Sequence, residues 1–248
     1  MRRFARRSIL AAAAAALVAT AALLVAYRAS QRVPEFYRRA LAAPPTAQSE
    51  GGQRFEQHAL ALHNQLHHAG RWEVRFAQDE INGWLASDLP AKFPRALPPG
   101  VSEPRIAIDR NAVRLAVHYQ RSGVDTVVSL AGQAYLTDQP NEVAIHIDQA
   151  RAGLLPVPLG KFVQEITERA ARAGVPLRWT EAHGAPVALI RVPLALDDVQ
   201  RRQFVLEQLR LGDGELVVAG RTEELADSED RAPPSTAIQS GDSEIRQR

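Results

Sequence analysis

The feature that most constrains this chain is an apolar segment near its amino terminus, residues 8–27. These 20 residues include ten alanines and contain neither a charged residue nor a proline. A helix of this length reaches about 30 Å, which is the thickness of the hydrocarbon core of a bilayer. We therefore expect residues 8–27 to form a single-pass transmembrane anchor that tethers everything after it to a cell membrane.

A cleavable signal peptide is the alternative to a retained anchor, because signal peptides also begin with basic residues. Residues 19–21 (Ala-Thr-Ala) have the form of a cleavage site, but a cut there would leave the apolar residues 22–25 as the new terminus. Residues 6–10 also resemble a twin-arginine export signal. The length of the apolar segment favours the retained anchor.

Arginines on both sides of the segment bear on its orientation. Four precede it and four follow it: Arg2, Arg3, Arg6 and Arg7, then Arg28, Arg32, Arg38 and Arg39. Basic residues favour the cytoplasmic side, so the arginine count is balanced and the free amino terminus tips it towards the cytoplasm. A long carboxy-terminal domain is translocated largely regardless of its charge. We expect a short cytoplasmic segment at residues 1–7 and a domain outside the cytoplasm after the anchor.

The composition of the chain is that of a protein with a packed core. It is 46% hydrophobic and 23% charged, and about 220 residues follow the anchor. The absence of cysteine excludes disulfides and thiolate chemistry. The net charge is only +2, and the basic residues do not gather with aromatic ones, so we expect no nucleic-acid partner.

Apolar residues at helical spacing predict three amphipathic helices. They cover residues 53–69, 78–89 and 161–173; in the first, Phe55, Ala59, Leu62 and Leu66 share one face. A juxtamembrane helix and linker are expected over residues 28–49, with a break at Pro34 and a linker at residues 43–49.

Alternating apolar residues predict strands through most of the remainder. The expected strands are residues 71–76, 105–109, 113–119, 126–136, 143–147, 177–180, 187–192, 203–211 and 215–219. The four strands between 105 and 147 form an antiparallel meander with one polar face, and the last hairpin completes the same sheet. We expect an α+β domain over residues 50–220, in which a curved antiparallel β-sheet packs on amphipathic helices. Residues 221–248 lack apolar periodicity, which predicts a disordered tail.

Chemistry-bearing residues do not form a recognisable site. His63 and His67 could present two imidazoles on one helix face, beside His58 and His68, but no third ligand or His-Glu-x-x-His motif accompanies them. Serines, paired carboxylates and glycine-rich loops also lack the patterns of hydrolases, glycosidases and nucleotide sites. We therefore expect no catalytic residue, no metal and no cofactor, and a protein that is not an enzyme.

Three short motifs resemble parts of bacterial membrane-anchored proteins. Residues 76–85 resemble a Phe-(Ser/Thr)-x-x-(Glu/Gln)-Ile-Asn-x-aromatic-Leu motif, although Ala77 stands where Ser or Thr would cap the helix. Residues 153–159 are similar to a Gly-x-Leu-Pro-Leu-Pro loop, and residues 214–220 to a closing strand. The region from Trp72 to Gly220 thus resembles the uncharacterised YpmS-like and YceB-like families. This resemblance implies a fold akin to tubular lipid-binding (TULIP-like) domains and brings no catalytic residues with it.

Three functions remain open from the sequence. The first is a membrane-tethered domain that binds lipid or another apolar ligand between sheet and helices. The second is a scaffold or interaction partner in a cell-envelope complex. The third, a metal-dependent hydrolase that uses His63 and His67, has the least support because the ligand set is incomplete.

Overall fold

The computed structural model describes residues 20, 25, 27–158, 160–172, 174–192 and 202–224. The expected anchor at residues 8–27, apart from residues 20, 25 and 27, and most of the expected tail therefore lie outside the described residues. No helix in the described part of the chain is long and apolar enough to cross a membrane.

The described residues form an α+β fold with two antiparallel sheets, which confirms the expected fold class in its coarse form. The helices are α2 (Glu35–Leu41), α3 (Pro45–Leu66), α4 (Gln78–Lys92) and α5 (Gly160–Arg172). The strands are β1 (Gly70–Ala77), β2 (Val101–Asp109), β3 (Ala112–Arg121), β4 (Val124–Leu136), β5 (Glu142–Ala152), β6 (Leu155–Pro156), β7 (Leu177–Ala182), β8 (Ala185–Arg191), β9 (Arg202–Gly212) and β10 (Glu215–Glu224).

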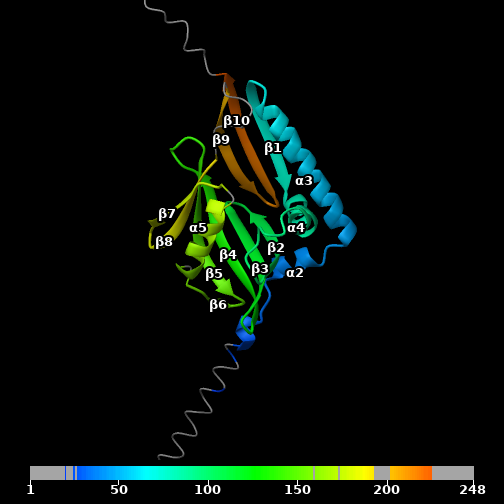
Figure 1. Cartoon of the computed structure of the whole chain (residues 1–248), viewed down its shortest axis with the longest axis vertical. Helices are drawn as coiled ribbons and strands as arrows, with labels where there is room; N and C mark the ends of the chain where they lie inside the picture. Colours follow the sequence, from blue (N-terminus) through cyan, green and yellow to red (C-terminus); the bar gives the residue numbers. More distant parts are fainter. Residues whose placement is uncertain are drawn as a thin grey trace, which may run out of the picture.

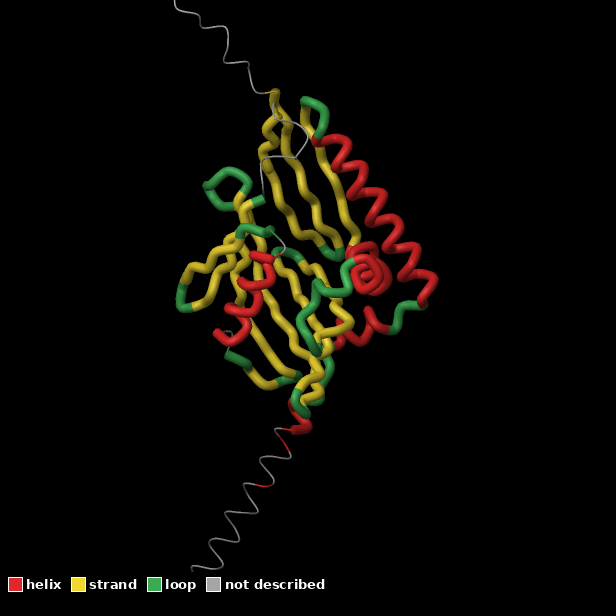
Figure 2. Tube along the Cα trace, viewed as in Figure 1, coloured by secondary structure: helices red, strands yellow, loops and turns green. Residues whose placement is uncertain are grey.

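The larger sheet has the strand order β2-β3-β4-β5-β8-β7, with β6 beside β5, and contains the predicted meander. The smaller sheet has the order β1-β10-β9. Figure 1 shows the smaller sheet at one end of the molecule and the larger sheet at the other, with α3 running along β1. Figure 2 shows the long loop that connects α4 to the start of β2.

The last hairpin was expected to complete the single sheet, and this prediction is wrong. β10 instead pairs with β1, and Val74 lies opposite Val218 in that pair. The apolar face of the small sheet is covered by α3, where the ring of Phe55 lies 5.1 Å from that of Phe76. β10 also runs four residues beyond the predicted boundary at Gly220, because backbone pairing continues where the apolar alternation stops.

Helix α3 begins earlier than predicted, at Pro45 rather than residue 53, so the expected linker at residues 43–49 is largely helical. Proline is well suited to the first turn of a helix, where its missing N–H has no partner to lose. Glycines inside α3 and α4 let the two helices cross closely. A Cβ on Gly83 would lie 2.5 Å from the carbonyl oxygen of Gln48, and one on Gly51 would lie 2.8 Å from that of Asp79.

The two faces of the larger sheet differ. On one face, Tyr37 of α2 packs against Ala116 and Val127 and is only 1% exposed. The opposite face, called here the apolar sheet face, carries side chains that are in register across the strands. It includes Ile106, Ile108, Val113, Leu115, Val117, Val128, Leu130, Ile145, Ile147, Trp179, Ala188 and Ile190. Helix α5 lies on this face, since the indole N–H of Trp179 donates to the hydroxyl of Thr167 at 2.8 Å.

One edge of the larger sheet is closed by side chains of α4 rather than by another strand. Asn82 pairs with the backbone of Ile106 through both ends of its amide: its Oδ1 accepts from the N–H at 2.8 Å and its Nδ2 donates to the carbonyl at 3.0 Å. One helical turn earlier, Gln78 Oε1 accepts from the N–H of Ile108 at 2.8 Å. These three polar groups of the β2 edge are therefore satisfied by a helix, and the carbonyl of Ile108 accepts from the N–H of Gly214 at 2.9 Å.

The edge of the smaller sheet is closed in the same way, from the other direction. Asn141, in the turn between β4 and β5, donates from Nδ2 to the carbonyl of Phe204 at 2.8 Å and accepts from the N–H of Leu206 at 2.7 Å. Asn141 is 2% exposed and has a φ of 56°, a conformation that asparagine tolerates better than most residues. The smaller sheet, through α4, thus places Asn82 on the edge of the larger sheet. The larger sheet places Asn141 on the edge of the smaller one.

We predict that Asn82→Ala and Asn141→Ala each lower the free energy of unfolding by about 1–3 kcal/mol, because each leaves buried backbone groups without partners. Asn64→Ala, at an exposed position of α3, is the matched control and should be neutral. Denaturant unfolding of the full chain in detergent measures all three. Equal stability of the Asn82→Ala, Asn141→Ala and Asn64→Ala variants would show that the two amide pairs do not hold the sheets together.

The end of β10 supplies a second stability prediction. Thr222 is buried and pairs with Gly70 on one side and Phe204 on the other. A chain that stops at Gly220 should therefore lose about 1 kcal/mol or more relative to one that stops at Glu224. Thermal unfolding of the two truncated chains, beside the full chain, tests this. If the chain that ends at Gly220 has the same melting temperature as the full chain, the domain boundary at Gly220 that the sequence predicted would be correct.

Candidate functional site

The largest cavity that we describe is an open groove of about 810 Å³, called here the proline groove. It lies between α4, the loop at residues 93–100, the start of β2 and α5. Its apolar lining is Leu85, Ala86, Leu89, Pro90, Phe93, Pro94, Leu97, Pro98, Pro99, Val101 and Pro104. Its polar lining is Gln48, Arg95, Ser102, Glu103, Arg105, Arg169 and Arg172. A concave apolar surface with a few polar groups is the usual form of a ligand site.

The sequence builds the groove from a rigid loop. Prolines restrict the backbone of residues 93–100, and Arg169 of α5 fixes it by donating to the carbonyls of Arg95 at 3.4 Å and Leu97 at 3.2 Å. At its far end, the N–H of Gln120 donates to the carbonyl of Gly100 at 2.7 Å. These contacts hold the groove open by protein groups alone. The end of the groove at Gly100, called here its lower end, lies beside the β3–β4 turn.

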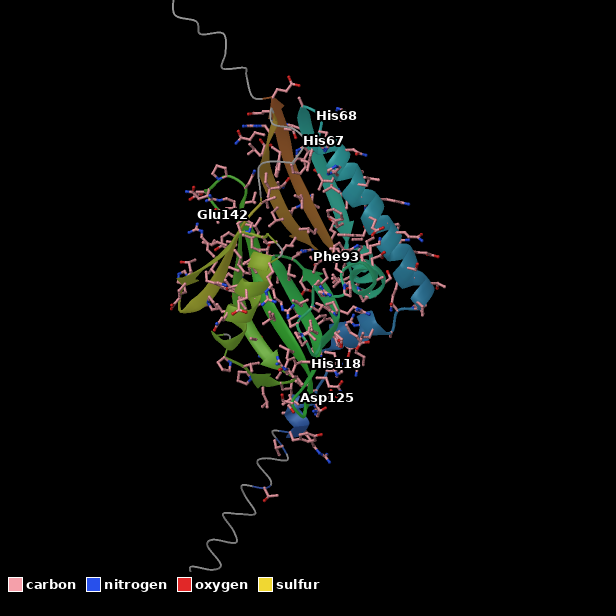
Figure 3. All side chains as sticks on the ribbon, viewed as in Figure 1. His67, His68, Phe93, His118, Asp125 and Glu142 are labelled. Atoms are coloured by element: carbon pink, nitrogen blue, oxygen red, sulfur yellow. The ribbon has the colours of Figure 1, made fainter. Side chains whose placement is uncertain are left out.

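Phe93 is the large apolar side chain that stands most open in the groove. It directly follows the last residue of α4, is 53% exposed, and its ring lies 6.0 Å from that of Trp84. Figure 3 labels Phe93 near the centre of the molecule, between α4 and the front of the larger sheet. An exposed aromatic ring at the mouth of an apolar groove is a contact surface for an apolar ligand.

Arg105 is the most buried charged residue of the groove. It is 5% exposed, and burial lowers the pKa of its guanidinium. Tyr37 of α2 packs against Ala116, the cross-strand partner of Arg105, and its pKa is raised to about 12, mainly by burial and also by the charge of Glu103. Nothing in the sequence pattern distinguishes Arg105, because it lies in an ordinary strand.

A second cavity, of about 530 Å³, lies between α2, α3, α4 and the β2–β3 hairpin. Its charged side chains are largely compensated nearby. Arg114 pairs with Asp109 at 2.8 Å, and Arg54 reaches Glu80 at 3.6 Å. Because these opposite charges are already paired with each other, the cavity has few free charged groups with which to bind a ligand.

Three residues that the sequence did not connect form a hydrogen-bonded chain across β2, β3 and β4. His118 lies 3.4 Å from the hydroxyl of Ser102 and 2.8 Å from Oδ1 of Asp125, and Figure 3 shows His118 and Asp125 close together. The hydrogen bond with His118 lowers the pKa of Asp125. The order matches a serine hydrolase triad, but the Asp125 side chain is 57% exposed, whereas the triad carboxylate is buried. We therefore interpret these three hydrogen-bonded side chains as a structural link between the ends of β2, β3 and β4.

Next to Asn141 lies an ion network in which a buried carboxylate meets two exposed arginines. The side chain of Glu142 is 3% exposed and accepts from Arg178 at 2.8 Å, with Arg191 at 3.8 Å. The hydrogen bond from Arg178 is the main reason that the pKa of Glu142 lies below its ordinary value. This network ties β5 to β7 and β8, and its charges are satisfied within the protein.

Of the four histidines in and just after α3, only His63 and His67 are in contact with each other. The Nε2 atoms of His63 and His67 lie 3.2 Å apart near the end of α3, and Figure 3 shows His67 and His68 at that end of the molecule. His58 instead binds Glu80 at 3.1 Å, one helix face away from them. The described part of the chain holds no group of three metal-ligating side chains. Absence of a metal here stays a prediction.

Comparison of the chain with family models, with curated proteins and with solved structures yields no match.

We predict that His63→Ala combined with His67→Ala changes neither metal content nor melting temperature, because two imidazoles do not complete a zinc site. Elemental analysis of the full chain purified without chelators, and its thermal unfolding, provide the readouts. His183→Ala, in an exposed turn, serves as the matched control. Zinc bound one per chain, and released by the double substitution alone, would contradict the prediction.

Proposed function

We propose that this protein is a membrane-tethered, extracytoplasmic domain that binds a lipid or a similar amphiphile in the proline groove. The observation that carries the proposal is the preformed groove of about 810 Å³ with an apolar lining and the exposed ring of Phe93. Such a site suits a ligand with an acyl chain, since burial of apolar surface stabilises the complex by about 25 cal/mol per Å².

The apolar sheet face supports the same proposal. Helix α5 touches both surfaces: Arg169 binds the groove loop, and Thr167 binds Trp179 on the sheet. Many side chains of this face are half-buried rather than fully buried, among them Leu115 and Leu130. A ligand that enters the groove beneath α5 would meet further apolar surface rather than a polar wall.

The direction from which the chain enters also supports the proposal. Residues that follow the expected anchor dock on the end of the larger sheet: Leu154 N–H donates to the carbonyl of Ala29, and Thr126 donates to that of Ser30. Val124 and Leu154 are each 51% exposed at this end. In the proposed arrangement this end faces the bilayer, so the lower end of the proline groove opens near the membrane surface.

The resemblance to the YpmS-like and YceB-like families supports the proposal only through the lipid-binding type of fold that it implies. In the motif at residues 76–85, Glu80 accepts from the N–H of Ala77 at 3.2 Å and Asn82 closes the β2 edge. These residues therefore serve the fold. In the proposal, binding rests on the groove that they position and needs no catalytic group.

We predict that a photoactivatable phospholipid, with its diazirine on the acyl chain, labels the groove when the full chain is reconstituted in vesicles. Adducts should map to peptides that contain Phe93 and Leu97. Phe93→Asp should reduce this labelling about fivefold or more, because a carboxylate is costly to bury against an acyl chain.

Leu60→Asp is the control, since Leu60 is 61% exposed on α3 and outside the groove. It should label as strongly as the unsubstituted chain. Adducts confined to residues 8–27, with none in the groove, would refute the proposed function.

A further inference from the structure

The proline groove contains a buried cation that the protein does not neutralise. Arg105 is 5% exposed, and its Nε has no hydrogen-bond partner. Its Nη1 donates to the carbonyl of Pro104 at 2.8 Å, which satisfies one donor without supplying a negative charge. Among the described residues, no carboxylate forms an ion pair with this guanidinium.

Burial of an unpaired charge is costly, and proteins usually pair such a group or bind a counter-ion. Glu103 acts on Arg105 only through space, and its own side chain is exposed. The lowered pKa of Arg105 has burial as its largest cause, which agrees with this picture. A guanidinium in this setting is a ready partner for an anion that brings its own negative charge.

The rest of the groove has the same charge bias. Four arginines line it against the single acid Glu103. Arg172 is engaged with Glu168 at 3.3 Å, and Arg169 with the loop carbonyls, whereas Arg95 is exposed and forms no ion pair in the described part of the chain. The apolar wall, with Leu89 and Phe93, lies in the same groove as these cations.

We infer that the ligand of the proline groove is an anionic amphiphile, with its apolar chain along α4 and an oxyanion head group beside Arg105. This inference rests on the proposed function and narrows it to a ligand class. Carboxylate and phosphate share the chemistry that a guanidinium recognises, which is a pair of oxygen atoms that accept two parallel N–H bonds. A head group of this kind would take the Nε that has no protein partner.

The test compares ligands that differ only in head group, on the full chain in a nonionic detergent. Lysophosphatidate, monoacylglycerol with the same acyl chain and inorganic phosphate are titrated while binding is followed. Lysophosphatidate should bind about tenfold or more tighter than monoacylglycerol, the gain expected of a charge-assisted pair. The preference should persist at 0.5 M salt (roughly a 4 Å Debye length), because a buried pair is screened little. Inorganic phosphate at millimolar concentration should not compete.

Arg105→Gln should remove the preference for lysophosphatidate and leave monoacylglycerol affinity unchanged. Arg71→Gln, on an exposed position of β1 outside the groove, is the matched control and should keep the preference. If Arg105→Gln does not fold, the head-group comparison and its salt dependence in the unsubstituted chain decide the matter alone.

The outcomes separate this inference from the proposed function. Equal binding of lysophosphatidate and monoacylglycerol would overturn the anion site and leave the lipid site standing. Binding of neither would overturn both. Tight competition by inorganic phosphate would show an anion site that needs no acyl chain, and would overturn the amphiphile.

Discussion

Two asparagine side chains hold this fold together. Each pairs with an edge strand through both ends of its amide, as a neighbouring strand would, and each joins one sheet to the other. Asn82 and Asn141 are both buried, at 7% and 2% exposure. A buried edge whose N–H and carbonyl groups lacked partners would cost several times the free energy that one hydrogen bond contributes. The relative position of the two sheets therefore depends on these amides, together with the hydrogen bond from the N–H of Gly214 to the carbonyl of Ile108.

The groove follows from this constraint. Because Gln78 and Asn82 fix α4 along the β2 edge, the end of α4 and the loop after it must return to the start of β2 over a short distance. The prolines keep that loop from collapsing onto the sheet, and Arg169 supports it from α5. The same geometry leaves Phe93 open and encloses Arg105. An apolar wall and a buried cation thus come together as a consequence of how the sheet edge is closed.

Much of the fold could be predicted from the sequence. The period of the apolar residues predicted the four strands of the meander and the helix at α4, since these depend on local pattern. The pairing of β1 with β10 could not be found in this way, because it joins segments far apart in the chain and both have the alternation that suits either sheet. The two asparagine pairings also could not be predicted. An asparagine in a turn, such as Asn141, is common and does not by itself indicate a contact with a distant strand. Arg105 had no sequence signal at all, and its role depends on burial alone.

The central claim is that the proline groove holds an amphiphile, and native mass spectrometry of the full chain, purified from its producing cells in a mild detergent, tests it most directly. The account predicts one bound amphiphile per chain that survives the activation needed to strip detergent, and an anionic class among the released ligands. The bare mass of the chain in every charge state, after gentle extraction, would contradict it.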